Sequence, residues 1–468
     1  MFGESQQIKS YSIRFAGFIF VLSISLFGLS CNSFNQPKEH NIPIRDESGE
    51  VQIIPFRKGK KWGYSDRNKQ ILIYPKYDQT YRFGEETALV KLGEKYGFID
   101  KNGKEITPPK YDYFDESLKN ADEIIPSAPS EKLFYVRADG KAGYIDKTGK
   151  EVIPLKYESA GAFSEGVAPV EIWNENYQFR TGFIDPSGKE VIPFNYFRAY
   201  PFSEGLAAVS QNEKWGFIDK NGKEIIPLKY DRATSFLKGF AAVKQAEKWG
   251  VIDNSGKEII APKYDEIYDF EKDLIRVKLA GKWGLIDRSG REISQIKYDD
   301  VEFFVDGMGI IELDKKQGFI DKTGKEIIPP KYDDVSQFQE GVAFVRLNNK
   351  WGFIDKTGKE VIPIKYDGGG SFQEGLATVT LNEKSGFIDK NGQEVLPFKY
   401  DYCYSFDKGV ARCKLDGKYG FIDKTGKEII PMIYEDIASN FINGLARVYR
   451  DNTPTFFIDK NGTEYYGP

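Results

Sequence analysis

The sequence predicts an all-β protein made of tandem copies of one short repeat, and three observations support that prediction. Near-identical strings recur, such as KWGFIDKNGKEIIPLKYD from Lys214 and KWGFIDKTGKEVIPIKYD from Lys350. A glycine marks each copy, and from Gly182 to Gly420 its spacing is 34 residues without exception. Aromatic residues make up 15% of the chain, a bias typical of strands. Self-similarity at a fixed short period indicates a repeat architecture, so the length of 468 residues counts copies rather than separate cores.

The marking glycine places the array between residues 51 and 468. It recurs at Gly63, Gly97, Gly143, Gly182, Gly216, Gly250, Gly284, Gly318, Gly352, Gly386 and Gly420. A degenerate twelfth copy holds Phe456, Phe457, Ile458 and Asp459. We therefore expect about twelve copies.

Each copy predicts three antiparallel strands. Residues 376–381 (LATVTL) alternate, which places Ala377 and Val379 on one face of a strand. A two-residue turn follows, and Asp139-Gly140 in another copy is a strong hairpin signal. After the aromatic-Gly-Phe-Ile strand, the Asp-Lys-Asn-Gly segment at 219–222 predicts a type I turn closed by a glycine bulge. The third strand carries a proline, which lacks an N–H and therefore predicts a sheet edge or a bulge.

These strands cannot form one sheet, because twisted open sheets rarely exceed ~10 strands. We expect small sheets that stack on their neighbours in the manner of propeller blades. Ordinary blades have four strands and ~40–45 residues, and rings have ~4–8 blades. The short period and the high copy number favour an open or spiral array of blade-like, three-stranded meanders. Closed β-propeller-like rings are the alternative.

The N-terminal residues predict export. Lys9 and Arg14 precede an apolar run from Phe15 to Leu29, and Cys31 follows directly. The run is short for a membrane span of ~20 residues, so residues 1–30 are interpreted as a signal peptide. Residues 31–50 are polar and are interpreted as a flexible tether.

The same segment resembles a bacterial lipoprotein signal, in which the cysteine is lipidated and becomes the new N-terminus. Gly28 departs from the leucine-like residue of that pattern. The resemblance implies an exported lipoprotein anchored to the membrane through Cys31 and facing the periplasm or the cell surface. A plain secretory signal cut nearby and an uncleaved anchor are the alternatives.

The Lys-Trp-Gly-Phe-Ile-Asp-Lys segments resemble the WG (or KWG) repeat family. The tryptophan stands at Trp62, Trp215, Trp249, Trp283 and Trp351, with Tyr96 and Tyr419 as conservative substitutes, and Ala142, Thr181, Gln317 and Ser385 depart from the motif. The resemblance covers nearly the whole chain from about residue 50. It implies a bacterial, often exported repeat protein, and it attaches no reaction and no catalytic residue to the repeat.

Composition excludes several functions. The net charge of −4 gives the chain no excess of positive charge with which to bind nucleic acid. The single histidine, His40, precedes the array, so the array cannot form a Ser-His-Asp arrangement or an imidazole metal site. We expect no enzyme, no catalytic residue, no metal and no cofactor.

Two sets of residues that recur from copy to copy, the turn aspartates and the tyrosines, are interpreted as structural. Aspartates such as Asp219, Asp253 and Asp355 could suggest a calcium loop, but the third ligand is missing and lysines flank them, which favours a repeated turn cap. The tyrosine of Lys-Tyr-Asp recurs from Tyr77 to Tyr434. An aromatic face for sugars or peptides is one interpretation, and packing between copies is the favoured one.

Cys403 and Cys413 occupy apolar, inward-facing positions that are valine or isoleucine in preceding copies. They are symmetric about the turn residue Lys408, which predicts cross-strand partners with Cβ atoms ~4.5–5.5 Å apart. We expect a structural disulfide, which an exported location permits, with two buried thiols as the alternative.

Two insertions break the period. Gly97 to Gly143 spans 46 residues, with the extra chain near 113–135, and Gly143 to Gly182 spans 39, with five extra residues near 173–180. Repeat proteins place insertions on one face, often the binding face. Trp173, Tyr177 and Phe179 are therefore the predicted ligand-binding residues, because such side chains are favoured at interaction hot spots.

The leading hypothesis is a non-enzymatic, exported binding or scaffold protein of the bacterial envelope. Its partner would be a protein, or a glycan, bound near residues 113 to 180. An envelope glycan-acting enzyme using an Asp/Glu pair and a purely structural spacer are the alternatives.

Overall fold

The computed structural model describes residues 53–83, 87–114, 133–146, 148–269, 272–442, 444–450 and 455–467. The chain divides into two compact units, 1–42 and 43–468, and every described residue belongs to the second. The predicted signal peptide, the tether and Cys31 lie outside the described residues. Where the structure describes the chain, no helix combines the length and apolarity needed to cross a membrane.

Each copy contributes up to four strands, of which the first to appear is short. The short strands are β4 (Gln79–Thr80), β8 (Tyr113–Phe114), β12 (Ser159–Ala160), β16 (Arg198–Ala199), β20 (Arg232–Ala233), β24 (Glu266–Tyr268), β27 (Asp300–Val301), β31 (Asp334–Val335), β35 (Gly368–Gly369), β39 (Tyr402–Cys403) and β43 (Asp436–Ile437). The first long strands are β1 (Ile54–Lys58), β5 (Thr87–Leu92), β9 (Leu133–Ala138), β13 (Ala168–Trp173), β17 (Ala207–Gln211), β21 (Phe240–Gln245), β25 (Leu274–Leu279), β28 (Met308–Leu313), β32 (Val342–Leu347), β36 (Ala377–Leu381), β40 (Val410–Leu415) and β44 (Leu445–Tyr449).

The next two strands complete each meander. The second long strands are β2 (Lys61–Ser65), β6 (Lys95–Asp100), β10 (Lys141–Asp146), β14 (Phe179–Ile184), β18 (Lys214–Ile218), β22 (Lys248–Asp253), β26 (Lys282–Asp287), β29 (Lys316–Asp321), β33 (Lys350–Asp355), β37 (Lys384–Ile388), β41 (Lys418–Asp423) and β45 (Phe456–Asp459). The third long strands are β3 (Ile71–Tyr77), β7 (Glu105–Tyr111), β11 (Glu151–Tyr157), β15 (Glu190–Tyr196), β19 (Glu224–Tyr230), β23 (Glu258–Tyr264), β30 (Glu326–Tyr332), β34 (Glu360–Tyr366), β38 (Glu394–Tyr400), β42 (Glu428–Tyr434) and β46 (Glu464–Gly467).

The strands form small antiparallel sheets in tandem, which confirms the predicted all-β repeat architecture. A typical sheet has the order β16-β17-β18-β19, so the chain meanders from the short strand to the third long strand. The short strand was not predicted. It follows the Tyr-Asp segment and pairs with the next first strand, as Arg232 does with Lys244. Two residues are too few to produce an alternating sequence pattern.

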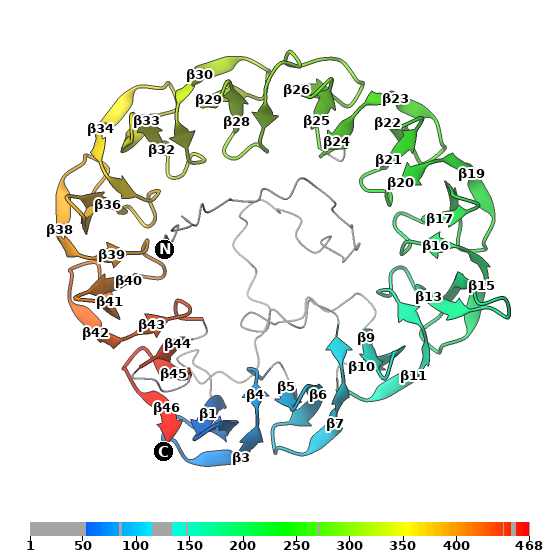
Figure 1. Cartoon of the computed structure of the whole chain (residues 1–468), viewed down its shortest axis with the longest axis horizontal. Helices are drawn as coiled ribbons and strands as arrows, with labels where there is room; N and C mark the ends of the chain where they lie inside the picture. The colour runs from blue at the N-terminus through cyan, green and yellow to red at the C-terminus, as the bar shows by residue number, and fades with distance from the viewer. Residues whose placement is uncertain are drawn as a thin grey trace, which may run out of the picture. The chain divides into compact units, whose positions relative to one another are not determined.

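The ends of the array meet, which settles the choice between an open array and a ring. Strand β1 pairs in parallel with β46, with Arg57 opposite Tyr466, so the first and last copies share one seven-stranded sheet. Arg82 adds hydrogen bonds from its guanidinium to the carbonyl oxygens of Ile442, at 2.5 Å, and Leu445, at 3.2 Å. The array is therefore closed rather than open, and Figure 1 shows the sheets in chain order with the last beside the first.

The predicted turns are present. Asn348 and Asn349, between β32 and β33, have φ values of 51° and 60°, as a type I′ hairpin turn requires. In the second turn, Gly222 has a φ of 77° and donates to the carbonyl oxygen of Asp219 at 2.9 Å. The Asp219 carboxylate accepts from the backbone N–H groups of Asn221 and Lys223, so this aspartate caps its own turn.

The third strand lies at the edge of its sheet and is bulged, as its proline predicts. In β18 and β19, Trp215 pairs with Tyr230 and Phe217 pairs with Ile226, so one residue of β18 faces three of β19. The single residue is Gly216. A Cβ on Gly216 would stand 2.7 Å from the backbone nitrogen of Leu228, which is why the repeat requires glycine here.

One sheet, β24-β25-β26, lacks its third long strand. Ser294 stands where most other copies have an isoleucine, and its hydroxyl accepts from the backbone N–H of Leu285 at 3.0 Å. The backbone N–H groups of Ile293 and Ser294 both donate to the Leu285 carbonyl oxygen. A side chain thus takes part of the hydrogen bonding that a regular strand would provide.

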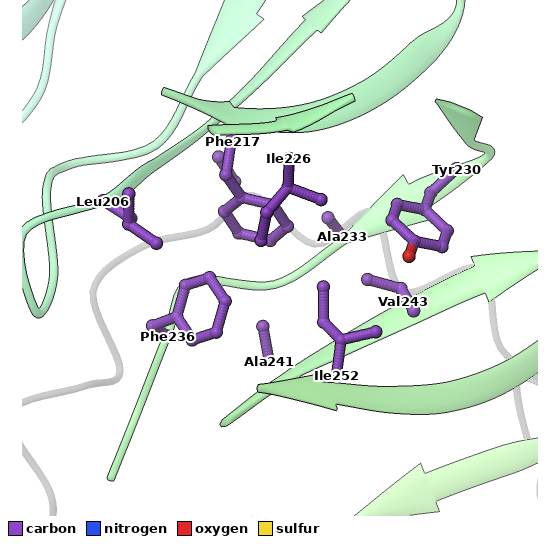
Figure 2. Packing of buried hydrophobic residues seen from close by; sticks show 10 residues of the cluster. Leu206, Phe217, Ile226, Tyr230, Ala233, Phe236, Ala241, Val243 and Ile252 are labelled. Carbon is purple, nitrogen blue, oxygen red and sulfur yellow. The ribbon is translucent and has the colours of Figure 1, made fainter. Parts of the chain in front are cut away.

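The core lies between consecutive sheets. Figure 2 shows Phe217 and Ile226 of one sheet facing Ala241 and Ile252 of the next, with Phe236 closing one side. The rings of Phe217 and Phe236 lie 4.7 Å apart, and the same contact recurs as Phe319–Phe338 and Phe387–Phe406. Each sheet therefore buries its faces only against its neighbours, as a repeat array must.

A lysine–acid pair recurs at the hairpin end of the sheets, which is the end where a turn joins the first and second long strands. The lysine begins the second strand and the acid follows the third, seventeen residues later: Lys61–Asp78, Lys95–Asp112, Lys141–Glu158, Lys214–Asp231, Lys248–Asp265, Lys282–Asp299, Lys316–Asp333, Lys350–Asp367, Lys384–Asp401 and Lys418–Glu435. The acid also reaches the next sheet, since Asp231 accepts from the backbone N–H of Ala246 at 2.9 Å. The pair therefore ties adjacent sheets together.

Candidate interaction site

The hairpin from Trp173 to Phe179 projects beyond the ends of the other hairpins. Strands β13 and β14 run one pair past Ile172–Arg180, which is where equivalent ladders such as Gln211–Lys214 end, and the added pair places Trp173 opposite Phe179. A five-residue turn joins the two strands. Asn174 holds this turn, because its backbone carbonyl accepts from the Tyr177 N–H and its Oδ1 accepts from the N–H groups of Asn176 and Gln178. The inserted residues therefore form an ordered turn of the type that aspartate and glycine form elsewhere in the repeat.

Tyr177 stands where that turn type has glycine. Its φ is 53°, in the left-handed region that side chains other than glycine occupy at a cost of roughly 1–2 kcal/mol. Its side chain is 86% exposed, so burial does not offset that cost. The tyrosine is therefore not explained by the stability of the hairpin.

Trp173 and Phe179 form an exposed aromatic pair. Their ring centroids are 3.7 Å apart at 30°, and the residues are 46% and 39% exposed. Each ring protects part of the other from water and leaves the rest accessible. The structure thus brings the three predicted binding residues together at one hairpin tip.

Phe197 is a further exposed aromatic residue, which the sequence reasoning missed. It follows β15 and is 50% exposed. Its carbonyl oxygen accepts from the Thr181 hydroxyl at 3.4 Å, which places it at the hairpin end of the same sheet. The available signal was a substitution: Asn195-Tyr196-Phe197 stands where most copies have Lys-Tyr-Asp.

The two insertions enter the array at different connections. The first lies between β8 and β9, where residues 115–132 are outside the described residues. The second lies between β13 and β14. The first connection precedes the first long strand of its copy, and the second follows the first long strand of its copy.

Glu171, on β13, is the only described carboxyl group with a raised pKa. Burial raises the pKa, and the positive charge of Arg198 opposes that shift. The recurring aspartates behave differently. Backbone hydrogen bonds hold the pKa of Asp219 below its usual value, and the Ser289 hydroxyl contributes most to lowering that of Asp287, to about 2. These aspartates act as turn caps, as predicted.

The recurring tyrosines mostly belong to the core. Tyr230, Tyr264 and Tyr298 are at most 2% exposed, so they form no open aromatic face. Tyr196, beside the projecting hairpin, is less buried. The described residues hold no group of three or more His, Cys, Asp or Glu side chains arranged for a metal ion.

Cys403 and Cys413 face each other across β39 and β40, and their sulfurs are joined at 1.98 Å. Both residues are buried. The same cross-strand position holds Val335 and Val345 in the β31–β34 sheet, so the cysteines replace an apolar contact.

Comparison with protein families identifies the repeat. A model described as "WG containing repeat" matches residues 62–96, 96–117, 143–177, 182–215, 215–249, 249–283, 283–316, 318–351, 351–384, 386–419 and 419–453. These tandem matches cover most of the chain. No curated protein matches it.

Solved structures resemble the chain only distantly. A crystal structure of the eukaryotic initiation factor is 12% identical over 81% of this chain and 97% of its own, with a TM-score of 0.32. The extracellular domain of a proposed one-component system from B. thetaiotaomicron is 10% identical over 91% of this chain and 77% of its own, with a TM-score of 0.25. A related extracellular domain, described as part of a hybrid two-component system from the same organism, is 9% identical over 90% and 82%, with a TM-score of 0.26.

Proposed function

Because the chain belongs to the WG repeat family, we propose that it is a non-enzymatic binding or scaffold protein of the bacterial cell envelope. The projecting hairpin provides the main support. Trp173, Tyr177 and Phe179 are exposed together there. Tyr177 adopts a positive-φ backbone conformation that is energetically unfavourable for a tyrosine. Sites that break a local rule without a gain in stability are expected to serve function.

The proposed envelope location rests on the sequence of residues 1–31, which resembles a lipoprotein signal ending at Cys31. The disulfide between Cys403 and Cys413 supports it, because such bonds persist in oxidising compartments. The partner would be a protein, or a glycan, reached from the membrane through the tether.

Affinity capture from an envelope extract of the producing cell tests the proposal. The bait is the chain from residue 31 onward, beside the variant Trp173→Ala/Tyr177→Ala. The proposal expects a partner that the parent retains and the variant loses. Tyr74→Ala is the matched control, since Tyr74 is an exposed aromatic residue of another sheet, at 71%. Identical captures for parent and double variant would remove the hairpin from the binding site and favour a structural spacer.

An enzyme acting on envelope glycans is the second candidate, and Glu171 is the observation that favours it. A general acid needs a raised pKa, and Glu171 is the described carboxyl group that has one. Such an enzyme also needs a second carboxyl group across the scissile bond. Release of sugar fragments from envelope glycans by the parent but not by Glu171→Gln would support this candidate against the binding role.

A further inference from the structure

The sheet with the projecting hairpin lacks the lysine–acid pair. Arg180 stands at the lysine position, since it pairs with Ile172 as Lys214 pairs with Gln211. Phe197 stands at the acid position, directly after β15. Among the sheets in which both positions are described, this is the only one without the pair. The positive charge is kept and the negative charge is replaced by an exposed aromatic ring.

Arg180 has no acidic partner among the described residues. Its Nη1 donates to the Phe179 carbonyl oxygen at 2.9 Å, and its Nη2 donates to Oε1 of Gln178 at 2.5 Å. These neutral acceptors hold the guanidinium on the face of the hairpin opposite the Trp173–Phe179 pair, because adjacent residues of a strand point to opposite faces, and they leave its charge unmatched. A second guanidinium, that of Arg198, lies 5.7 Å from the centre of the Phe197 ring.

The loss of the acid also weakens a junction. In most other sheets the acid accepts from the turn of the following sheet, as Asp367 does from the Asn382 N–H at 2.8 Å. Phe197 cannot accept this bond. The junction instead has a long contact from Nε2 of Gln211 to the Asn195 carbonyl oxygen, at 3.5 Å. Stability therefore does not explain Phe197, just as it does not explain Tyr177.

We propose that this end of the β12–β15 sheet binds an acidic peptide segment of another protein. A carboxylate of that segment takes the place of the missing acid and accepts hydrogen bonds from Arg180. Apolar side chains of the same segment cover Phe197 and, on the other face of the hairpin, the Trp173–Phe179 pair. The inference rests on the proposed function and names the class of partner.

Charge and geometry favour this occupant. The planar guanidinium matches a carboxylate with two parallel hydrogen bonds, and exposed tryptophan, tyrosine and arginine are the residues that dominate protein interfaces. A neutral sugar would leave the positive charge of Arg180 without a negatively charged partner. Glu175, in the turn, and Glu171, whose pKa is raised by burial, are the acidic groups nearest in sequence to this surface.

The test uses the variant Phe197→Asp, which restores the residue that most other sheets have. We expect it to fold with a thermal midpoint at or above that of the parent, because Arg180 gains the usual acid. Peptides from a displayed random library are selected on the full chain, and each enriched peptide is then measured on parent and variant. The expected peptides carry an aspartate or glutamate beside an apolar residue. Phe197→Asp, Arg180→Gln and amidation of the peptide carboxylate should each weaken binding by about tenfold or more.

Asp231→Phe is the matched control, because it breaks the same pair in the next sheet. It should leave peptide binding unchanged. Enriched peptides without acidic residues, or peptides that bind parent and Phe197→Asp equally, would overturn the proposal. So would binding of an acidic oligosaccharide, such as oligogalacturonate, that Phe197→Asp abolishes while no peptide is enriched.

The two proposals fail differently. If the envelope partner depends on Trp173 and Tyr177 but the selected peptides need no carboxylate, the binding function stands and the acidic-segment assignment fails. If the envelope partner binds the Trp173→Ala/Tyr177→Ala variant as well as it binds the parent, the proposed binding function of the hairpin itself fails.

Discussion

Gly216 and Ile226 approach so closely that a Cβ built on Gly216 would stand 2.5 Å from the Ile226 carbonyl oxygen. The neighbouring backbone of Pro227 and Leu228 is nearly as close to that Cβ, at 2.8 and 2.7 Å. The same clash with the third-strand segment recurs at the marking glycine of other copies, for example at Gly318 and Gly420. The glycine of the repeat motif is therefore required by the bulge of the third strand that crosses it.

Gly216→Ala should destabilise the protein by about 1–3 kcal/mol, the usual cost of forcing an extra carbon into packed backbone. Denaturant unfolding measures the loss. Gly368→Ala is the matched control, because its nearest neighbour is a Thr380 side-chain atom at 3.9 Å and its φ is not positive. Equal stabilities of the two variants would contradict this account of the motif.

Tyr177→Gly should leave the free energy of unfolding unchanged or raise it by up to ~1 kcal/mol, because glycine adopts positive φ without the side-chain penalty. Tyr177→Ala keeps the backbone penalty and serves as the comparison. Thermal melts of the three proteins measure the difference. A loss above ~1 kcal/mol in the glycine variant would show that the exposed ring has a structural role.

The disulfide should contribute about 2–3 kcal/mol, since it closes a loop with a sequence separation of 10. Cys403→Val/Cys413→Val should lose less than Cys403→Ala/Cys413→Ala, because Val335 and Val345 fill the equivalent position without a bond. Unfolding under non-reducing conditions compares the variants. Alkylation of both thiols in the unreduced, unfolded protein would contradict the bond.

Acid should weaken the fold between about pH 4 and pH 2. Hydrogen bonds hold the folded-state pKa of Asp287 at about 2, and lysine pairing lowers those of Asp231 and Asp299 from 3.8. A lowered folded-state pKa gives stability that is fully present above the unfolded value and disappears as pH falls through the folded value. The thermal midpoint, followed by circular dichroism, should therefore fall as pH drops below 4. A constant midpoint from pH 5 to pH 2 would contradict a stabilising role for these carboxylates.

Arg82→Leu should cost about 1–3 kcal/mol, because two hydrogen bonds from a charged donor to the last copy are lost. Arg137→Leu is the comparison, since the Arg137 guanidinium donates within its own sheet, to the Gly140 carbonyl oxygen at 3.4 Å. Denaturant unfolding measures both. A larger loss for Arg137→Leu would contradict the importance of the closing contact.

The repeated parts of the fold could be predicted from the sequence because each structural feature depends on a short local residue pattern. Asp139-Gly140 determines a turn, and Gly222 determines a bulge. The alternation of inward-facing and outward-facing residues around Val379 determines a strand. Closure could not be predicted, because it depends on the small rotation between consecutive sheets summed over the whole array, and no single residue encodes that sum. Strand β46 pairing with β1 is its result.

The candidate site could be predicted only in part. Trp173 and Phe179 were found because the insertion breaks the period. Phe197 was missed because it replaces an aspartate without changing the spacing, and its meaning depends on Arg180. Comparing the copies position by position, rather than by length alone, would have exposed both substitutions.

The parallel pairing of β1 with β46 also constrains how this array can evolve. An open solenoid can gain or lose a terminal unit, because only one junction is affected. Here a duplicated or deleted unit would require every junction to adopt a new rotation at once, or the seam would open. Variation is therefore channelled into loops and single positions within an existing copy, which is where the long hairpin and Phe197 are found.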